Sequence, residues 1–394
     1  MLPLSGIRVI AWTIGVAGPY GGMILADLGA EVINMERRGE HRRIGGALFT
    51  ARNKKSITID ARTDDGKEII RKLIATTDVF YENYAPSSIE RLGFSPEEVF
   101  KINPRIVYAS GKGYGEGPYG MRPAYDPCIE AEAGWMDLTK EREAEKTPLR
   151  CGVPSVDIIA GMFNALTIIG ALLKRRNTGK GEYIRVNMFE EAVSIMSHHI
   201  ALYTLYGRTL GPIGIGEGAD RAYETADWWV YVDAHSDESW TKLCKALDVD
   251  EETMRTFASQ ETREENPDAV EDVLAKVISK MTTRDVVKKL REVEVPAGAV
   301  NLLREVIDDP HLQATGTLTR LVYPKEMLTG LRMANYDKAG VATMCPVRTS
   351  AYNPSVVGWG GRRAPDLGED TRVILQELGY TPEQITDLRE RKIV

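Results

Sequence analysis

The fold is decided by residues 152–182, which read GVPSVDIIAGMFNALTIIGALLKRRNTGKGE. Within residues 158–173 the only polar side chains are those of Asn164 and Thr167. A run this apolar is typical of a helix buried in a protein core. Ser155 is expected to be its N-cap, and a basic run that precedes a glycine marks its end.

The side chain of Asp157 falls in the first turn of this predicted helix. There, backbone N–H groups and the positive end of the helix dipole favour the ionised carboxylate. A carboxylate kept charged at the edge of an apolar core is a candidate nucleophile. The alternative is that Asp157 only completes the helix cap, because acidic residues are common in first turns. The residues alone leave both interpretations open.

The composition is that of an ordinary soluble protein. The chain has 394 residues, enough for two domains, and 43% of them are hydrophobic and 27% charged. A net charge of −7 argues against a nucleic-acid partner. The N-terminus lacks the basic and apolar regions of a signal peptide, so we expect a cytoplasmic protein. The apolar run is short for a membrane span and is interpreted as core, so no membrane partner is expected.

No metal site and no tightly bound cofactor are expected. Cysteines at positions 128, 151, 244 and 345 are scattered without CxxC spacing, which favours reduced thiols over disulfides or a zinc site. His198 and His199 are adjacent and cannot share a helix face, and the other histidines are far away in sequence.

Short apolar runs alternate with helical patterns along the first half of the chain. Strands are expected at residues 7–12, 31–35, 78–81, 106–110 and 183–186, and helices at 19–28, at 64–77 and from 95 onward. This alternation predicts an open, mostly parallel α/β sheet.

A change in the sequence pattern after about residue 210 predicts how the chain is divided into domains. We expect a large α/β domain over residues 1–210, a small α+β domain with linkers over 211–320, and a C-terminal segment over 321–394. A glycine-rich stretch separates the first two parts. Further elements are expected at 228–232 (a strand) and at 240–247, within 262–293 and at 371–378 (helices).

Six segments carry a resemblance to a known family. They are LSGIRVI (4–10) through LADLGAEVI (25–33), NKKSITID (53–60), ENYAP (82–86) through RLG (91–93), the segment 152–187, VPAGAV (295–300) and APDLGE (364–369). Each segment alone is a weak signal, but their order and spacing together are specific. On these residues the chain resembles the family III CoA-transferases (the CaiB/BaiF family), the group of formyl-CoA transferase and carnitine CoA-transferase.

The resemblance implies an enzyme that moves CoA from an acyl-CoA donor to a small carboxylic acid, so that CoA thioesters are substrates. An aspartate at the position of Asp157 attacks the donor thioester in this family, giving an aspartyl–acyl anhydride and then an aspartyl-CoA thioester. The family fold joins a Rossmann-like large domain to a smaller α+β domain, with two chains threaded as interlocked rings. The resemblance implies that the C-terminal segment 321–394 returns to the large domain. We therefore expect an intertwined homodimer, or a heteromer with a paralogous subunit.

The resemblance also implies which residues hold CoA, whose phosphates need arginines and backbone donors. The implied residues are Arg37 and Arg91 at the nucleotide end, Ile14, Gly15, Val16 and Ala17 along the molecule, Ile59 near the adenine, the contact pair Asn83 and Tyr84, and Leu92 beside Arg91. The nearby Arg38, Arg42 and Arg43 are expected to be solvated surface residues.

The segment 122–134 distinguishes two branches of the superfamily. Racemases of acyl-CoA thioesters have a histidine where this chain has Tyr125, and a tyrosine with an ordinary pKa of about 10 is a poor base near neutral pH. Transferases carry a tyrosine followed by an acid, as Tyr125 and Asp126 do, and usually a glutamine where this chain has Glu130. Glu130 is therefore either an extra carboxyl group in the site or a partly exposed helix residue. All three are candidates to support Asp157.

A glycine-rich loop covers the active site in this family, and Gly214, Gly216 and Gly218 are expected to supply it. Other functions fit less well. A nicotinamide site needs GxGxxG, which the first βαβ unit lacks. An acyl-CoA racemase or epimerase is disfavoured by Tyr125, a hydrolase needs a site open to water, and a non-catalytic CoA-binding subunit conflicts with an intact Asp157. The identity of the donor and acceptor acids does not follow from the sequence.

Overall fold

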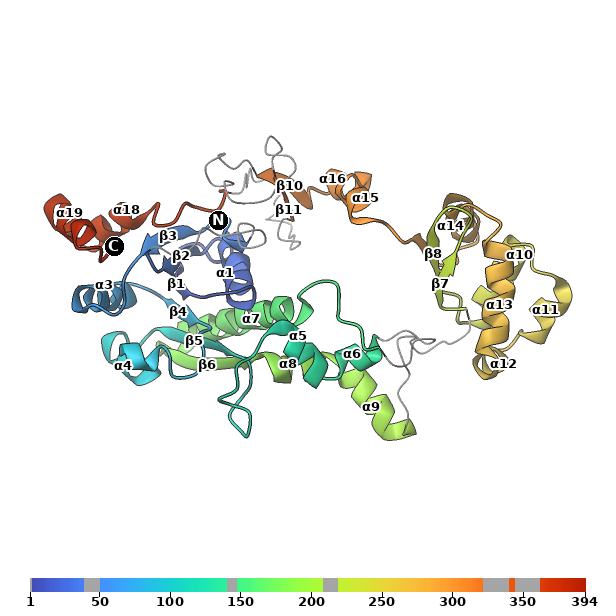
Figure 1. Cartoon of the computed structure of the whole chain (residues 1–394), viewed down its shortest axis with the longest axis horizontal. Coiled ribbons are helices and arrows are strands. Elements are labelled where there is room, and N and C mark those ends of the chain that lie inside the picture. The colour runs from blue at the N-terminus through green and yellow to red at the C-terminus, as the bar shows by residue number, and fades with distance from the viewer. Residues whose placement is uncertain (1, 39–49, 140–146, 208–218, 322–339, 344–361) are drawn as a thin grey trace. The chain divides into compact units, whose positions relative to one another are not determined.

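The computed structural model describes residues 2–38, 50–139, 147–207, 219–321, 340–343 and 362–394 (Figure 1). The chain divides into two compact units. Unit 1 comprises Met1–Met136, Arg150–Ser197 and Pro310–Val394, and unit 2 comprises Asp137–Leu149 and His198–Asp309. The domain boundaries that we predicted from the sequence stay predictions.

A six-stranded parallel sheet forms the centre of unit 1, with the strand order β3-β2-β1-β4-β5-β6. Its strands are β1 (Arg8–Trp12), β2 (Glu31–Glu36), β3 (Lys55–Thr58), β4 (Val79–Glu82), β5 (Val107–Lys112) and β6 (Glu182–Asn187). The predicted α/β fold with a parallel sheet is confirmed. The order reverses between β1 and β4, so the carboxyl ends of these two strands form a topological switch point, where α/β proteins bind ligands.

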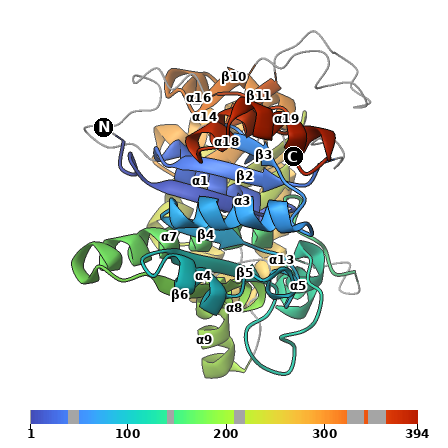
Figure 2. The same ribbon diagram turned by 90° about the vertical axis from the view of Figure 1, so that its left-hand side faces the viewer.

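Helices cover both faces of this sheet. They are α1 (Ala17–Asp27), α3 (Asp64–Ala75), α4 (Pro96–Ile102), α5 (Asp126–Glu132), α7 (Ser155–Thr178), α8 (Met188–Ile195), α18 (Thr371–Glu377) and α19 (Pro382–Glu390). In β1, Val9 and Ala11 pack with α1 and α7, whereas Ile10 and Trp12 pack with α3, α4, α18 and α19. Figure 2 shows α3 in front of the strands of this sheet. Because successive strand residues point to opposite faces, one strand serves two apolar cores.

Shorter elements complete unit 1 and join it to unit 2. In unit 1 they are the 3-10 helix η1 (Glu90–Leu92), α16 (Pro310–Ala314) and the antiparallel pair β10 (Leu318–Leu321) and β11 (Gly340–Thr343). The helices α6 (Trp135–Leu138) and α9 (Ser197–Tyr206) contain the points at which the chain passes from one unit to the other. Arg38 is exposed, as we expected, and it also donates to the carbonyl oxygens of Arg389 (2.9 Å) and Val394 (2.8 Å), because the C-terminal residues lie beside the end of β2.

The sequence pattern of α3 shows why these helices form where they do. Thr63 caps the helix by accepting a hydrogen bond from the backbone N–H of Gly66, and two aspartates occupy the first turn. The apolar stripe of the helix is fully buried and consists of Ile69, Ile70, Leu73 and Ile74. Burial of each such side chain contributes about 1.5–3 kcal/mol, so the stripe fixes α3 on the sheet.

The helix α7 packs against α1 at very short range. A Cβ atom on Gly161 would lie 2.8 Å from the carbonyl oxygen of Ala17, and one on Gly21 would lie 2.8 Å from the carbonyl oxygen of Gly161. Only glycine permits this approach of two helix backbones. The helix ends at Gly179, whose φ of +72° is the left-handed conformation of a helix C-cap. The predicted end of this helix is therefore correct.

Only one face of α7 is buried, whereas we expected burial on all sides. Met162, Leu166 and Leu173 are exposed by 53–63% in the single chain. Among the described residues, α7 is the one helix whose length and apolar character would allow it to cross a membrane, and 44% of its most apolar stretch is buried. A helix of a protein core passes the same test, so this is weak evidence for a membrane span.

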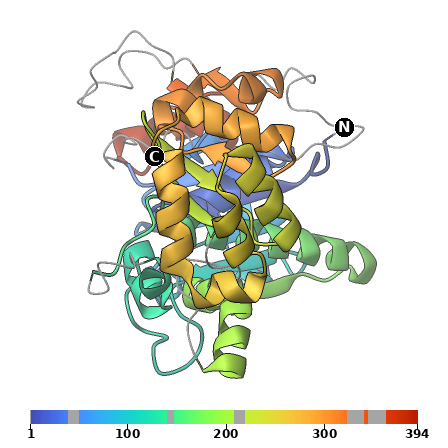
Figure 3. The same cartoon turned by 90° about the vertical axis from the view of Figure 1, so that its right-hand side faces the viewer.

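Unit 2 has its own sheet and core (Figure 3). Its antiparallel strands are β7 (Arg221–Glu224), β8 (Trp229–Val232) and β9 (Ala297–Ala299), in that order. Its helices are α10 (Asp237–Ala246), α11 (Glu251–Thr256), α12 (Gln260–Glu265), α13 (Pro267–Ile278), α14 (Thr283–Glu292) and α15 (Leu303–Ile307). Trp240, Leu274 and Leu290 are fully buried in the core between these helices and β8.

Candidate active site

A pocket of about 320 Å³ lies at the carboxyl edge of the parallel sheet in unit 1. It is lined by the segments that follow β1, β4 and β5, by the residues that precede α5, and by the first two turns of α7. The lining residues are 14–18, 83–86, 111–113, 122–125, Asp157, Ala160, Asn164, Val186 and Met188. The pocket therefore occupies the topological switch point of the sheet.

Asp157 lies in the first turn of α7 and lines this pocket. Burial raises the pKa of its carboxyl group from 3.8 to about 6, the charge of Asp126 adds to the shift, and Arg150 opposes it. We expected the helix N-terminus to dominate and to favour the ionised form. That expectation was wrong, because the loss of water and a second carboxylate outweigh the helix dipole here. The group is still about nine-tenths ionised at pH 7, and it is more basic than a free aspartate.

Asp126 explains why the helix dipole has so little effect on Asp157. Its carboxylate accepts hydrogen bonds from the backbone N–H groups of Val156 (3.0 Å) and Asp157 (3.1 Å). It also forms an ion pair with Arg150 at 3.1 Å, although it is only 3% exposed. The cap of α7 thus comes from another helix, and the N-cap position is held by Pro154. Ser155 was predicted to be the cap, but it is the first residue inside the helix.

Glu130 is fully buried one turn along α5 from Asp126. The alternative of a partly exposed helix residue was therefore wrong. Its carboxylate accepts a hydrogen bond from the backbone N–H of Cys151 at 3.0 Å. Burial raises the pKa of Glu130, and the nearby charge of Asp126 acts in the same direction. Both effects favour a protonated, neutral side chain beneath the pocket.

Tyr125 lines the pocket at the N-cap position of α5, and its side chain is 74% exposed. The backbone oxygen of Tyr125 accepts hydrogen bonds in the first turn of the helix, from the N–H groups of Cys128 and Ile129. Its ring is therefore free to contact a molecule that enters the pocket.

Six of the ten residues predicted to bind CoA line the same pocket. They are Ile14, Gly15, Val16, Ala17, Asn83 and Tyr84. Asn83 ties the two loops together, because its side-chain oxygen accepts from the N–H of Ile14 (2.7 Å) and its NH₂ group donates to the carbonyl of Ile14 (2.9 Å). Gly15 has a φ of +71°, which few other residues adopt.

The other four predicted CoA-binding residues do not line the pocket. Arg37 is exposed after β2, where its charge helps to lower the pKa of Asp60 to about 2, a shift caused chiefly by Arg62. Ile59 is 3% exposed in the core, with Leu92 partly buried against that core. Arg91 is exposed and donates to the hydroxyl of Ser88 at 3.3 Å.

These four residues follow the ends of β2, β3 and β4, which places them at the same edge of the sheet as the pocket. Their role in CoA binding stays a prediction. The predicted loop glycines Gly214, Gly216 and Gly218, as well as Arg42 and Arg43, lie outside the described residues.

Sequence reasoning missed four polar residues of the pocket region. Lys112 and Arg122 line the pocket, Asn164 lies two turns beyond Asp157 on the same face of α7, and Glu82 ends β4 beneath it. A signal existed for Glu82 and Lys112, because charged residues at the ends of buried parallel strands usually have a function. Asn164 was noticed only as one of two polar residues in an apolar helix.

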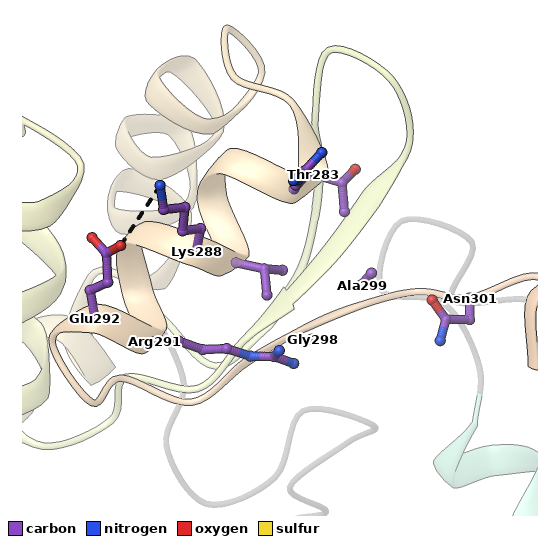
Figure 4. A pocket seen from close by; sticks show the side chains of 9 residues that line it. Thr283, Lys288, Arg291, Glu292, Gly298, Ala299 and Asn301 are labelled. Atoms are coloured by element: carbon purple, nitrogen blue, oxygen red, sulfur yellow. Dashed lines mark ion pairs between the residues drawn. The ribbon is translucent and has the colours of Figure 1, made fainter. Parts of the chain in front are cut away.

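Unit 2 carries a larger hollow of about 770 Å³ between α14 and β9 (Figure 4). Its cationic side chains are Arg284, Lys288 and Arg291, which share one exposed face of α14, and Lys288 lies 4.0 Å from Glu292. No buried carboxylate, thiol or imidazole lines it, so we place the candidate active site at Asp157. In the described part of the chain, no group of three or more side chains has the arrangement of a metal site.

Comparison with known proteins relates the whole chain to one family. The family model described as CoA-transferase family III matches residues 4–371. A succinyl-CoA–D-citramalate CoA-transferase of Chloroflexus aurantiacus is 30% identical over 100% of this chain and 98% of its own length. A succinyl-CoA:glutarate CoA-transferase of Homo sapiens is 30% identical over 100% of this chain and 90% of its own length.

A solved structure shares the fold. The crystal structure of a CAIB/BAIF family protein from Brucella suis superposes with a TM-score of 0.80 and is 28% identical. The match covers 96% of this chain and 99% of the Brucella suis chain.

Proposed function

The chain belongs to CoA-transferase family III and is an acyl-CoA:carboxylate CoA-transferase, and we propose that Asp157 carries the transferred groups. The observation that carries this proposal is the position of Asp157 in the pocket at the sheet's switch point. Among the described residues, Asp157 is the carboxylate that lines this pocket. Its pKa is raised to about 6, so the carboxyl group is mainly ionised at neutral pH.

The proposed reaction starts when a carboxylate oxygen of Asp157 attacks the carbonyl carbon of the donor thioester. A C–O bond forms and the C–S bond breaks, which gives an aspartyl–acyl anhydride and CoA thiolate. The thiolate then attacks the aspartyl carbonyl, releases the donor acid as its carboxylate and leaves an aspartyl-CoA thioester. The acceptor carboxylate repeats these two steps in reverse, so that Asp157 is regenerated. No proton is gained or lost overall.

The residues around Asp157 support this sequence. The carboxylate of Asp126 accepts hydrogen bonds from the backbone N–H groups of Val156 and Asp157, which fixes the first turn of α7. Because these N–H groups are already bonded to Asp126, they do not neutralise the charge of the Asp157 carboxylate. Glu130, where the family resemblance implies glutamine, is buried, and burial raises its pKa. A protonated carboxyl group has an O–H donor beside an acceptor oxygen, and glutamine has an NH₂ donor group beside an acceptor oxygen. We propose that a protonated Glu130 takes the place of that glutamine.

We further propose that the acids exchanged are dicarboxylic. Relatives that match the whole chain are named for succinyl-CoA with citramalate or glutarate. Of the two cations that line the pocket, Lys112 is fully hydrogen-bonded to Glu82 and Tyr84. Arg122 is half exposed, stacks on Tyr119 and has only a long, exposed ion pair of 4.0 Å with Glu132 among the described residues. The guanidinium group of Arg122 is suited to a second carboxylate.

We also propose that a second copy of the chain covers the exposed apolar face of α7, as expected for an intertwined homodimer. Met162, Leu166 and Leu173 form this face. Light scattering should give the mass of a dimer, and Leu166→Asp should reduce it to that of a monomer. A stable monomer of the unaltered chain would refute a homodimer, and recovery only with a different subunit would indicate a heteromer.

The experiment that tests the function supplies succinyl-CoA and a panel of acids without ATP. We expect new CoA thioesters from C4 and C5 dicarboxylates and little product from monocarboxylates of equal length. Arg122→Gln should raise the KM of the dicarboxylate without affecting transfer to a monocarboxylate. Release of free CoA at the same rate with and without acceptor would instead indicate a hydrolase.

A further inference from the structure

A buried ion pair lies beneath the pocket, at the ends of two neighbouring strands. Glu82 ends β4 and Lys112 ends β5, and their side chains are 2% and 6% exposed. The ammonium group of Lys112 contacts both carboxylate oxygens of Glu82, at 2.8 and 2.9 Å. The hydroxyl of Ser110 donates to the same carboxylate at 2.5 Å.

The ion pair forms hydrogen bonds with both backbone polar groups of Tyr84. Glu82 accepts a hydrogen bond from the backbone N–H of Tyr84 at 2.9 Å, and Lys112 donates to the carbonyl oxygen of Tyr84 at 2.7 Å. The chain has left the sheet at this point, since β4 ends at Glu82. The ion pair therefore fixes a loop segment that no strand pairing holds.

Further hydrogen bonds connect this segment to the other wall of the pocket. Asn83 lies between Glu82 and Tyr84 and bonds to both backbone groups of Ile14, at 2.7 and 2.9 Å. The segment 83–86 and the segment 14–18 are the two pocket walls at the switch point. Hydrogen bonds from Lys112 and Glu82 to Tyr84, the covalent chain between Tyr84 and Asn83, and the hydrogen bonds of Asn83 thus connect the ion pair to Ile14.

Stability alone does not account for charged residues at this position. Burial of an ion pair costs several kcal/mol per ion, and apolar residues of equal size are often as stabilising. The pair also does not act on the substrate directly. A lysine ammonium group has three hydrogens, and the two carboxylate oxygens and the Tyr84 carbonyl occupy all three.

From these contacts we infer that Glu82 and Lys112 are positioning residues, which hold the 14–18 and 83–86 segments at the separation that the CoA thioester requires. The inference rests on the proposed function, because it assigns the two walls to CoA. Its structural part, the rigidity of the two segments, does not depend on that function.

Glu82→Gln is the test, since it keeps the size of the side chain and removes its charge. We expect the Kd of CoA, measured by calorimetry, and the KM of the acyl-CoA donor to rise by about tenfold or more. The KM of the acceptor acid should change by less than about twofold, and kcat should fall less than the donor's KM rises. Hydrogen–deuterium exchange should accelerate in peptides that cover residues 14–18 and 83–86.

Asp27→Asn is the matched control. Asp27 and Arg52 form a buried ion pair with 1% and 2% exposure, at the opposite end of α1 from the pocket. This variant should lose stability without any change in the Kd of CoA or in exchange at the two pocket segments. Ser110→Ala removes one donor from Glu82, should show the Glu82→Gln pattern at smaller amplitude, and serves as the test if Glu82→Gln does not fold.

Two results would overturn the inference. One is an unchanged CoA Kd and unchanged exchange of the two segments in Glu82→Gln. The other is an equal loss of CoA binding in Asp27→Asn, which would show that any buried pair has this effect. If the unaltered protein does not bind CoA at all, the proposed function fails, whereas the exchange data still decide whether the pair holds the two segments.

Discussion

Replacement of Asp157 by asparagine is expected to abolish CoA transfer and, at neutral pH, to stabilise the fold. Asparagine removes the nucleophile but keeps the shape of the side chain. The gain in stability follows from the pKa of Asp157, which is raised from 3.8 to about 6 by burial and by the charge of Asp126. In the unfolded chain the same carboxyl group ionises freely.

The sign follows from linkage. A carboxyl group whose pKa is raised in the folded state contributes stability below its unfolded pKa, and this contribution is lost as the pH rises to the folded pKa. The shift of about two units corresponds to about 3 kcal/mol at most. Because the group still lines an open pocket, solvent screening reduces this to about 1–2 kcal/mol.

Urea unfolding at a series of pH values provides the assay. The difference in unfolding free energy between Asp157→Asn and the unaltered chain should grow in favour of the variant from pH 4 to pH 6. Above about pH 7 it should be constant. Asp126→Ala is the contrasting control, because it removes the cap of α7 and should destabilise by about 0.5–2 kcal/mol. A difference for Asp157→Asn that does not vary with pH would refute the reasoning.

Three further predictions concern the neighbours of Asp157 and the ligand. Glu130→Gln should retain activity within about twofold, because a neutral amide of the same size also presents a donor group beside an acceptor oxygen; a loss of more than about a hundredfold in kcat would mean that Glu130 transfers a proton. Arg91→Ala should weaken CoA binding roughly ten- to a hundredfold through one lost phosphate contact, with a smaller effect on a pantetheine thioester, whereas equal effects on both ligands would point to misfolding. A chiral 2-methylacyl-CoA in heavy water should gain no α-deuterium, since Tyr125 is a poor base near neutral pH; rapid deuterium uptake that depends on Asp157, without CoA transfer, would favour a racemase.

The features that the sequence predicted well are those encoded locally. Each of the strands β1, β2, β4, β5 and β6 contains a short group of apolar or aromatic residues, and the end of α7 is marked by Gly179. The strand β3 was missed because it is short and half polar, and it is recognisable only by its pairing with β2. The last helix, α19, was also missed, although Thr381 and Gln384 form a capping box that the sequence displays.

The features that could not be predicted depend on contacts between distant residues. The cap of α7 comes from Asp126, which is 30 residues away from Val156 in sequence. Burial between segments that are distant in sequence raises the pKa of Asp157, and the charge of Asp126 adds to that shift. The burial of Glu130 has the same origin, since helix α5 packs under the first turn of α7. The family resemblance, not a local pattern, indicated the residues after β1 and β4 that line the pocket, and it did not indicate the polar network that connects them.

The central claim, that Asp157 becomes covalently loaded, has a direct test. Trypsin should release residues 151–174 as one peptide, in which Asp157 is the only side-chain carboxylate. The protein is incubated with its acyl-CoA donor, trapped with hydroxylamine, digested and analysed by mass spectrometry. We predict a hydroxamate on this peptide that requires the acyl-CoA and is absent from Asp157→Asn. A hydroxamate on a different peptide, or normal turnover by Asp157→Asn, would contradict the account.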